Sequence, residues 1–224
     1  MIPVYKVHLR VIILFIVCSC LAGIFSPSHA WPVKSYHELR YEHVRGQNTS
    51  TSCGPASLAT LFSEFYGEDI TEHRIVELIK PYLEEEIEKL KEGDLPEGGV
   101  SMLDLKKVSE ELGFPAKGYE VPEENLPMIM RKLRVPLLIH LEEPDEHFSL
   151  TVTEFNGQFF LADPTWGVRS IGKRELFDRW DGLILAFSPR NGQKERAREV
   201  IKRIEKEVEE RALIQRISRE FFGI

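Results

Sequence analysis

The chain has 224 residues, of which 42% are hydrophobic and 29% are charged, as expected of a soluble globular protein. Its formal net charge at pH 7 is -7, and it contains no strongly basic stretch. An acidic chain without such a stretch gives no reason to expect nucleic acid as a partner.

The first 30 residues have the pattern of a secretory signal. Lys6 and Arg10 precede an uncharged run over residues 11–25, and the small residues Ser28 and Ala30 follow that run. A basic flank, a short apolar core and a small-x-small exit are typical of a cleaved signal peptide. The apolar run is shorter than the roughly 20 residues that span a bilayer, so an uncleaved membrane anchor is the weaker alternative.

Cleavage of this signal changes the charge and the cysteine content of the mature chain. Residues 1–30 hold two basic residues and no acidic one, so the net charge moves from -7 to -9. Cys18 and Cys20 leave with the signal, and Cys53 is then the only cysteine. A single cysteine in an exported protein cannot form an internal disulfide, so Cys53 is either a buried thiol or a reactive one. We expect an exported, periplasmic protein that has no membrane attachment after cleavage.

The chain after the signal divides into one domain, residues 31–190, and a charged helical tail, residues 191–224. Within the domain, apolar residues at helical spacing predict helices. They are expected over residues 53–66, 71–79, 101–112 and 123–133. Apolar runs between turn signals predict strands over residues 116–121, 136–141, 147–155, 158–162 and 183–187. Helices first and a mostly antiparallel sheet after them predict an α+β fold.

Three segments outside these elements have weaker signals. Residues 31–50 are expected to form an irregular or extended lead-in, and the charged stretch 81–97 is expected to be a solvated surface segment. His140 is predicted to be a core histidine with a satisfied partner, and Trp166 and Trp180 are predicted to lie in the core.

The tail is rich in helix-forming residues over 194–221. Its apolar residues are expected to form one narrow stripe, made of Ala197, Ile201, Ile204, Val208, Leu213, Ile217 and Phe221. Leaving such side chains in water forgoes about 1.5–3 kcal/mol each. The stripe is therefore predicted to dock, either on the preceding domain or on a partner protein.

Cys53 is predicted to begin a helix. Ser52 is a residue type that caps helices, and Pro55 is tolerated in the first helical turn. The N-terminus of a helix favours a thiolate over a thiol, because its free N–H groups and the positive end of its dipole stabilise negative charge. Gly54 leaves room beside the sulfur for the approach of a carbonyl group. The alternative is a small residue that is simply packed at the start of a helix.

A histidine and an aspartate are expected to meet near this cysteine. His147 opens an apolar strand, and Asp163 follows across the hairpin that Asn156-Gly157 predicts. Pairing of the two strands brings Asp163 back beside His147, where its carboxylate can accept a bond from one imidazole nitrogen while the other faces a thiol. This is the Cys-His-Asp version of a catalytic triad.

These residues resemble the C39 peptidases, papain-like enzymes that in their best-known form cut leader peptides after a Gly-Gly pair. In that family a glutamine six positions before the cysteine provides the oxyanion hole, which implies this role for Gln47. The family histidine also opens a strand, as in His147-Phe148, and an Asp-Pro pair follows it, as in Asp163-Pro164. The resemblance covers roughly residues 41–188.

The resemblance implies a papain-like fold, with N-terminal helices packed on an antiparallel sheet, and cleavage of a peptide bond in an exported protein or leader peptide. It implies no cofactor and no metal, and His37, His43 and His73 show no metal-ligand spacing. The chain looks like the stand-alone exported relatives, some of which accompany the export of functional amyloid fibres. Its expected partners are a polypeptide substrate and, through the tail, export machinery or a fibre subunit.

Two other functions compete with peptide hydrolysis. The first is a non-catalytic C39-like module that holds an export substrate; such modules usually lack the cysteine, which this chain keeps at position 53. The second is another papain-like chemistry, such as amidase action on cell-wall peptides or acyl transfer. The spacing of Gln47 and the Asp163-Pro164 pair argue against the second.

The signal-peptide interpretation predicts that the exported protein begins at Trp31. Mass spectrometry of the N-terminal peptide, taken from the periplasmic fraction, measures this directly. An N-terminus at Met1 in a membrane fraction would instead support the uncleaved anchor.

Overall fold

The computed structural model describes residues 34–83, 95, 99–142 and 146–222, without the side chains at 214, 215, 217, 218, 221 and 222. The predicted signal at residues 1–30 and most of the charged stretch 81–97 lie outside the described residues. Among the described residues, no helix combines the length and the apolar character that a membrane crossing requires.

The elements follow the predicted order of helices before strands. The α-helices are α2 (Tyr36–Arg40), α3 (Cys53–Thr60), α4 (Glu72–Ile79), α5 (Met102–Glu111), α6 (Leu126–Leu133), α7 (Lys173–Arg179) and α8 (Gln193–Phe222). The shorter helical segments are η1 (Leu61–Phe65), η2 (Lys80–Tyr82) and η4 (Glu123–Asn125). The strands are β1 (Ala116–Glu120), β2 (Leu137–Leu141), β3 (His147–Phe155), β4 (Gln158–Asp163), β5 (Gly167–Gly172) and β6 (Trp180–Phe187).

The six described strands form one sheet in the order β1-β6-β2-β3-β4-β5, and every neighbouring pair is antiparallel. The α+β prediction is therefore confirmed. The predicted Asn156-Gly157 turn joins β3 to β4, with Phe155 opposite Gln158. Both turn residues have positive φ, 53° for Asn156 and 75° for Gly157, as a two-residue hairpin turn requires.

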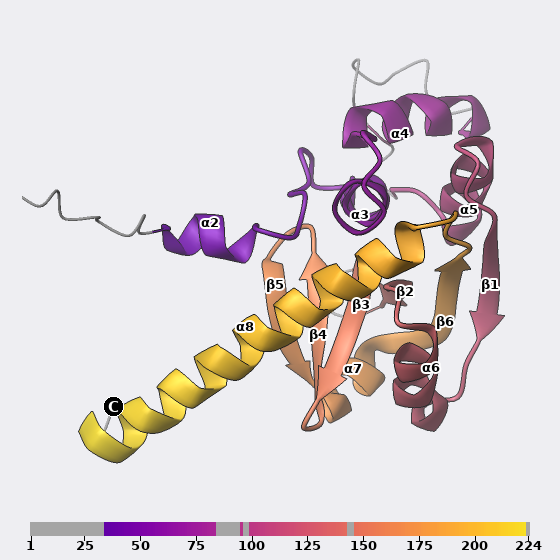
Figure 1. Cartoon of the computed structure of the whole chain (residues 1–224). Coiled ribbons are helices and arrows are strands. Elements are labelled where there is room, and N and C mark those ends of the chain that lie inside the picture. Colours follow the sequence, from indigo (N-terminus) through magenta and orange to yellow (C-terminus); the bar gives the residue numbers. More distant parts are fainter. Residues whose placement is uncertain (1–33, 84–94, 96–98, 143–145, 223–224) are drawn as a thin grey trace, which may run out of the picture. The chain divides into compact units, whose positions relative to one another are not determined.

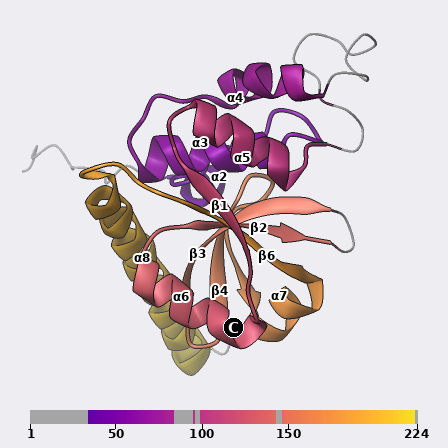
Figure 2. The same cartoon turned by 90° about the vertical axis from the view of Figure 1, so that its right-hand side faces the viewer.

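Helices lie on both faces of this sheet, so its central strands are covered from two sides (Figures 1 and 2). Strand β2 shows the alternation: Leu138 belongs to the core cluster that also holds residues of α3, α4, α5 and α8. Leu137 and Ile139 belong to a second cluster, with residues of α6 and α7. Successive side chains of a strand point to opposite faces, so β2, β4 and β6 contribute buried residues to both clusters. The sheet is thereby a rigid platform for residues at the ends of its strands.

Four elements differ from the sequence prediction. The predicted helix over residues 53–66 is α3 followed by η1, a stretch of wider π-type turns. Helix α2 lies in the lead-in that was predicted to be irregular, and β5 and α7 were not predicted. Strand β5 has neither a continuous apolar run nor strict alternation, so its conformation depends on pairing with β4, which local sequence does not reveal.

Helix α8 docks on the domain with its first half. Ala197, Val200, Ile201 and Ile204 are buried in the first core cluster, and Val208 packs against it. The predicted docking of the tail is confirmed there, on its own domain. The predicted single stripe is wrong at Leu213, because at about 100° per residue position 213 lies on the opposite side of the helix from position 204. The side chains of Ile217 and Phe221 lie outside the described residues.

The second half of α8 leaves the domain. Leu213 is 46% exposed, and the C-terminal end of the helix extends beyond the sheet (Figure 1). The boundary predicted at residue 190, between a domain and a separate tail, stays a prediction.

Substitutions on the two halves of α8 are expected to differ sharply in cost. Ile201 is 1% exposed, so Ile201→Ala should lower the free energy of unfolding by about 2–5 kcal/mol. Leu213→Ala, the matched control on the exposed half, should change it by less than about 0.5 kcal/mol. Urea unfolding of the purified variants measures both values. Equal, small effects would contradict the docking of the helix in solution.

Candidate active site

Cys53 is the first residue of α3, as predicted, but Ser52 does not cap this helix. The Ser52 hydroxyl donates to the Thr49 carbonyl and accepts from the Thr49 N–H, both at 3.1 Å. Its backbone angles, φ -98° and ψ 19°, are not those of a usual capping residue, so the hydroxyl turns toward the preceding loop. The prediction of a Ser52 cap is therefore wrong. The Gly54 N–H remains free to bond the Cys53 sulfur instead.

Gly54 has a packing role besides the one expected from sequence. A Cβ atom at this position would lie 2.9 Å from Leu105 Cδ1 and 3.1 Å from Val100 Cγ2. Glycine therefore lets α3 approach α5 closely. This contact sets the distance between α5 and the end of α3 that carries Cys53.

Strand β3 presents its first residues to Cys53. The Phe148 N–H donates to the Cys53 sulfur at 3.5 Å. One turn further along α3, the Ser57 hydroxyl donates to the Phe148 carbonyl at 3.3 Å. These two bonds hold the start of α3 against the start of β3. His147, the neighbour of Phe148, is thereby placed beside Cys53, and the two side chains shift each other's pKa.

Asp163 ends β4 and is fully buried. Its Oδ1 lies 3.1 Å from His147 Nε2 and accepts from the N–H groups of Thr165 at 2.9 Å and Trp166 at 3.1 Å. Its Oδ2 accepts from Arg169 Nε at 2.8 Å. The structure therefore brings Cys53, His147 and Asp163 together in the predicted order.

Arg169 is the site residue that the sequence analysis missed. It lies on β5, where the β4–β5 register places it opposite Leu161, two residues from Asp163. Because β5 was not predicted, nothing in the sequence placed an arginine beside the aspartate. The guanidinium compensates part of the cost of burying the carboxylate.

The pKa values of the three groups move together. Burial raises the pKa of the Cys53 thiol, but bonds from His147 and the Phe148 N–H outweigh it and lower that pKa overall. Burial lowers the pKa of His147, but its bonds to Asp163 and Cys53 raise it to about 9. Burial also raises the pKa of Asp163, but the bond from His147 and the nearby cations lower it. The directions of these shifts favour the charged form of each group, a thiolate, an imidazolium and a carboxylate in sequence.

Gln47 is bonded into the segment that follows Asp163. Its Oε1 accepts from the Thr165 hydroxyl at 2.8 Å, and its backbone N–H donates to the Pro164 carbonyl at 3.0 Å. Its side-chain amide donates one N–H to the Thr49 carbonyl at 2.8 Å. A glutamine amide has two such N–H groups, so a second donor remains for another acceptor.

The aromatic residues near the site correct one prediction and confirm another. Trp166 was predicted to be in the core but is 54% exposed. Its backbone carbonyl accepts from Arg40 Nε at 2.7 Å, which holds it on the surface beside α2. Trp180 is buried, as predicted. His140 has the predicted partner, because its Nδ1 lies 3.0 Å from Asp181 Oδ2.

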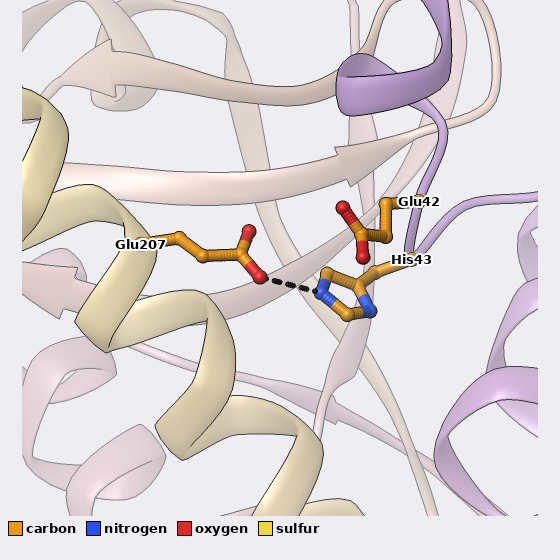
Figure 3. A group of neighbouring side chains, drawn as sticks. All are labelled: Glu42, His43 and Glu207. Carbon is orange, nitrogen blue, oxygen red and sulfur yellow. Dashed lines mark hydrogen bonds and ion pairs between the residues drawn. The ribbon is translucent and has the colours of Figure 1, made fainter. Parts of the chain in front are cut away.

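Glu42, His43 and Glu207 are the described residues whose side chains could hold a metal ion (Figure 3). One ligand atom from each lies within 4.8 Å of the others. His43 is buried and its Nε2 lies 3.2 Å from Glu207 Oε1, so a hydrogen bond between the lead-in and α8 already accounts for the proximity of these two side chains. No triad residue belongs to this group, and the predicted absence of a metal requirement stays a prediction.

The arrangement is papain-like. Cys53 begins a helix, His147 begins the strand beside it, and the buried Asp163 lies behind the histidine. The family model described as "Peptidase C39 family" matches residues 41–192. The chain therefore belongs to the Peptidase C39 family.

Among curated proteins, a Pseudomonas aeruginosa protein named "Probable functional amyloid protease FapD" is 26% identical over 155 residues. The match covers 69% of this chain and 64% of that protein, so the chain spans less than two thirds of its relative.

Two solved structures share the fold. The peptidase domain of Streptococcus ComA aligns with a TM-score of 0.54 and 21% identity, over 66% of this chain and 98% of that one. A double glycine motif protease from an AMS/PCAT transporter, solved with its leader peptide, aligns with a TM-score of 0.50 and 23% identity, over 66% and 91% of the two chains. At these identities the likeness shows the papain-like fold alone.

Replacing Arg169 should make the thiol harder to ionise. Removing a cation raises the pKa of each group nearby, so Arg169→Met should move the Cys53 thiolate transition to higher pH, by up to about one unit. It should also lower the free energy of unfolding by about 3–5 kcal/mol, because Asp163 loses a buried partner. The rate of iodoacetamide alkylation against pH measures the first effect, and urea unfolding measures the second.

Arg174 on α7 offers a matched control, since its side chain is 95% exposed. Arg174→Met should leave both measurements unchanged. An unchanged alkylation profile in Arg169→Met would show that the arginine does not influence the thiol.

Proposed function

We propose that this protein is an exported cysteine peptidase that cleaves a peptide bond of an exported protein or a leader peptide. Cys53 is the nucleophile, His147 is the base, Asp163 orients that base and Gln47 donates to the oxyanion. The observation that carries this proposal is the placement of Cys53, His147 and the buried Asp163: His147 Nε2 lies 3.1 Å from Asp163 Oδ1, and the residue next to His147 bonds the Cys53 sulfur. The lowered pKa of the thiol and the imidazole pKa raised to about 9 agree with it.

The imidazole is oriented for proton transfer in both directions. Its Nε2 is bonded to Asp163, which leaves Nδ1 as the ring nitrogen that can face Cys53. When the thiolate attacks the substrate carbonyl carbon, the imidazolium gives its proton to the departing amine. A water molecule then attacks the thioester, His147 takes its proton, and the acid and the free thiolate are released. The fixed ring position keeps one proton available through both halves of the cycle.

Gln47 supports the step in which charge appears on the substrate oxygen. A donor that is held in place before the reaction stabilises the oxyanion without the cost of reorganising during it. The Gln47 amide is held at its oxygen by Thr165 and at its nitrogen by the Thr49 carbonyl. Its second N–H is the proposed oxyanion donor.

The substrate class is inferred from the relatives. The name of the Pseudomonas aeruginosa relative links it to functional amyloid, and the AMS/PCAT enzyme was solved with a leader peptide. Both names support a polypeptide as the substrate of this chain. We place the protein in the periplasm, because of the predicted signal at residues 1–30. Contact between the second half of α8 and export machinery or a fibre subunit stays a proposal, supported by the exposure of Leu213.

Cys53→Ala is expected to abolish cleavage while leaving the fold intact. Purified protein is incubated with the unprocessed secreted proteins of its own host, and new N-termini are identified by mass spectrometry. Cuts made by the wild-type protein and absent with Cys53→Ala are the expected result, because the alanine has no nucleophile. Cuts that persist with Cys53→Ala would rule out this nucleophile.

The same material distinguishes the alternative of a non-catalytic binding module. Such a module would retain an exported protein on an affinity column equally well with Cys53 or with alanine, and neither form would produce new N-termini. Circular dichroism melting of Cys53→Ala against the wild type serves as the control for folding.

A further inference from the structure

Glu72 is a buried carboxylate whose hydrogen bonds from the preceding loop all come from Asn48, the residue next to Gln47. It is the first residue of α4 and only 7% exposed. Its two oxygens accept from the Asn48 backbone N–H at 3.1 and 3.2 Å, and Oε2 also accepts from Asn48 Nδ2 at 2.7 Å. A buried carboxylate is costly unless such bonds compensate it. The bonds from Asn48 therefore indicate the structural role of the Glu72 carboxylate.

These bonds are not needed to cap α4. The Thr71 hydroxyl already caps this helix by accepting from the Arg74 N–H at 3.2 Å. Both oxygens of Glu72 are instead directed away from its own helix, to a loop that lies 24 residues earlier in the chain. The position at the helix N-terminus favours the negative charge, so α4 contributes an ionised acceptor to that loop.

Asn48 lies in the middle of the loop that holds the Gln47 side chain. It stands between Gln47 and Thr49, and the bond from Gln47 Nε2 to the Thr49 carbonyl closes a ring around it. The Ser52 hydroxyl holds the Thr49 carbonyl from the α3 side at 3.1 Å. Glu72 holds the backbone N–H and the side chain of Asn48 within the same ring.

We propose that Glu72 is a positioning residue for the oxyanion hole: through Asn48 it keeps the second N–H of Gln47 aimed at the place where the substrate oxygen becomes negative. This inference rests on the proposed function, in which Gln47 is the oxyanion donor. Small displacements of a positioning group cost large factors in rate, since a shift of about 1 Å can lower a rate on the order of 100-fold.

The proposal separates two kinds of reaction at the same sulfur. p-Nitrophenyl acetate acylates the thiolate through a tetrahedral intermediate: the sulfur bonds the carbonyl carbon, its oxygen becomes an oxyanion, and p-nitrophenolate leaves with the electron pair of the broken C–O bond. Iodoacetamide alkylates the same thiolate by displacing iodide, and no carbonyl oxygen gains charge. Only the first reaction uses an oxyanion donor, and neither depends on the identity of the natural substrate.

The experiment measures both rates for full-length wild-type protein, Glu72→Gln, Asn48→Ala, Gln47→Ala and Glu77→Gln, with Cys53→Ala as the baseline. Glu77→Gln is the matched control, because it makes the same chemical change on the same helix at a side chain that is 47% exposed. Gln47→Ala and Glu72→Gln should each lower the acylation rate about tenfold or more, and Asn48→Ala should lower it by a smaller factor. All three should keep the alkylation rate within about twofold, and Glu77→Gln should change neither rate.

Each other outcome has a definite meaning. If Gln47→Ala slows acylation but Glu72→Gln and Asn48→Ala do not, Glu72 has no positioning role, while the proposed function stands. If Glu72→Gln slows both reactions equally, its role is structural support of the whole site, and the inference is wrong. Should Gln47→Ala leave acylation unchanged, or wild type react no faster than Cys53→Ala, the proposed function itself fails. Should Glu72→Gln not fold, Asn48→Ala decides the question alone, from the loop side of the same bonds.

Discussion

The buried charge of Asp163 is the interaction on which the rest of the site depends. A fully buried carboxylate is unfavourable by several kcal/mol unless it is bonded on all sides, and Asp163 is. One of its oxygens meets His147 and two backbone N–H groups, and the other meets Arg169. These partners come from three separate parts of the fold: the start of β3, the turn after β4, and β5. The carboxylate thereby joins the sheet, the loop and the imidazole into one electrostatic unit.

This unit explains why the pKa of the Cys53 thiol is lowered although the thiol is largely buried. The helix N-terminus alone is a modest influence, and Ser52 does not act as its cap. The larger effect comes from His147, whose positive charge is held by the aspartate behind it. From sulfur to carboxylate the charges alternate in space, negative, positive and negative, and each stabilises its neighbour.

The sequence predicted those parts of the fold whose signals are local. The hairpin at Asn156-Gly157 and the helix beginning at Cys53 depend on turn residues, helix-start signals and apolar spacing, and both are present. Strand β5 was missed because its residues gain their conformation from the neighbouring strand, and Arg169 was missed with it. Glu72 has no sequence signal at all, since its partner Asn48 is distant in the chain and contacts it only in the folded state.

The tail shows how a periodic pattern can mislead over a long helix. Apolar residues at helical spacing predict one stripe, yet Leu213 lies on the side of α8 opposite the buried Ile204. The first half is buried against the domain and Leu213 is exposed. A spacing rule that is correct over two or three turns accumulates angular error over eight, so a 30-residue helix needs its positions counted around the axis.

The order of strands in the sheet also determines which strands could pair with an extended segment of another protein. Its edge strands are β1 and β5. Strand β1 carries the exposed charges Lys117 and Glu120, and β5 begins at Gly167, so close to the backbone of Arg40 that no side chain would fit there. Charge along β1 and the close approach of Arg40 to the first residue of β5 both oppose the addition of a foreign strand at these edges.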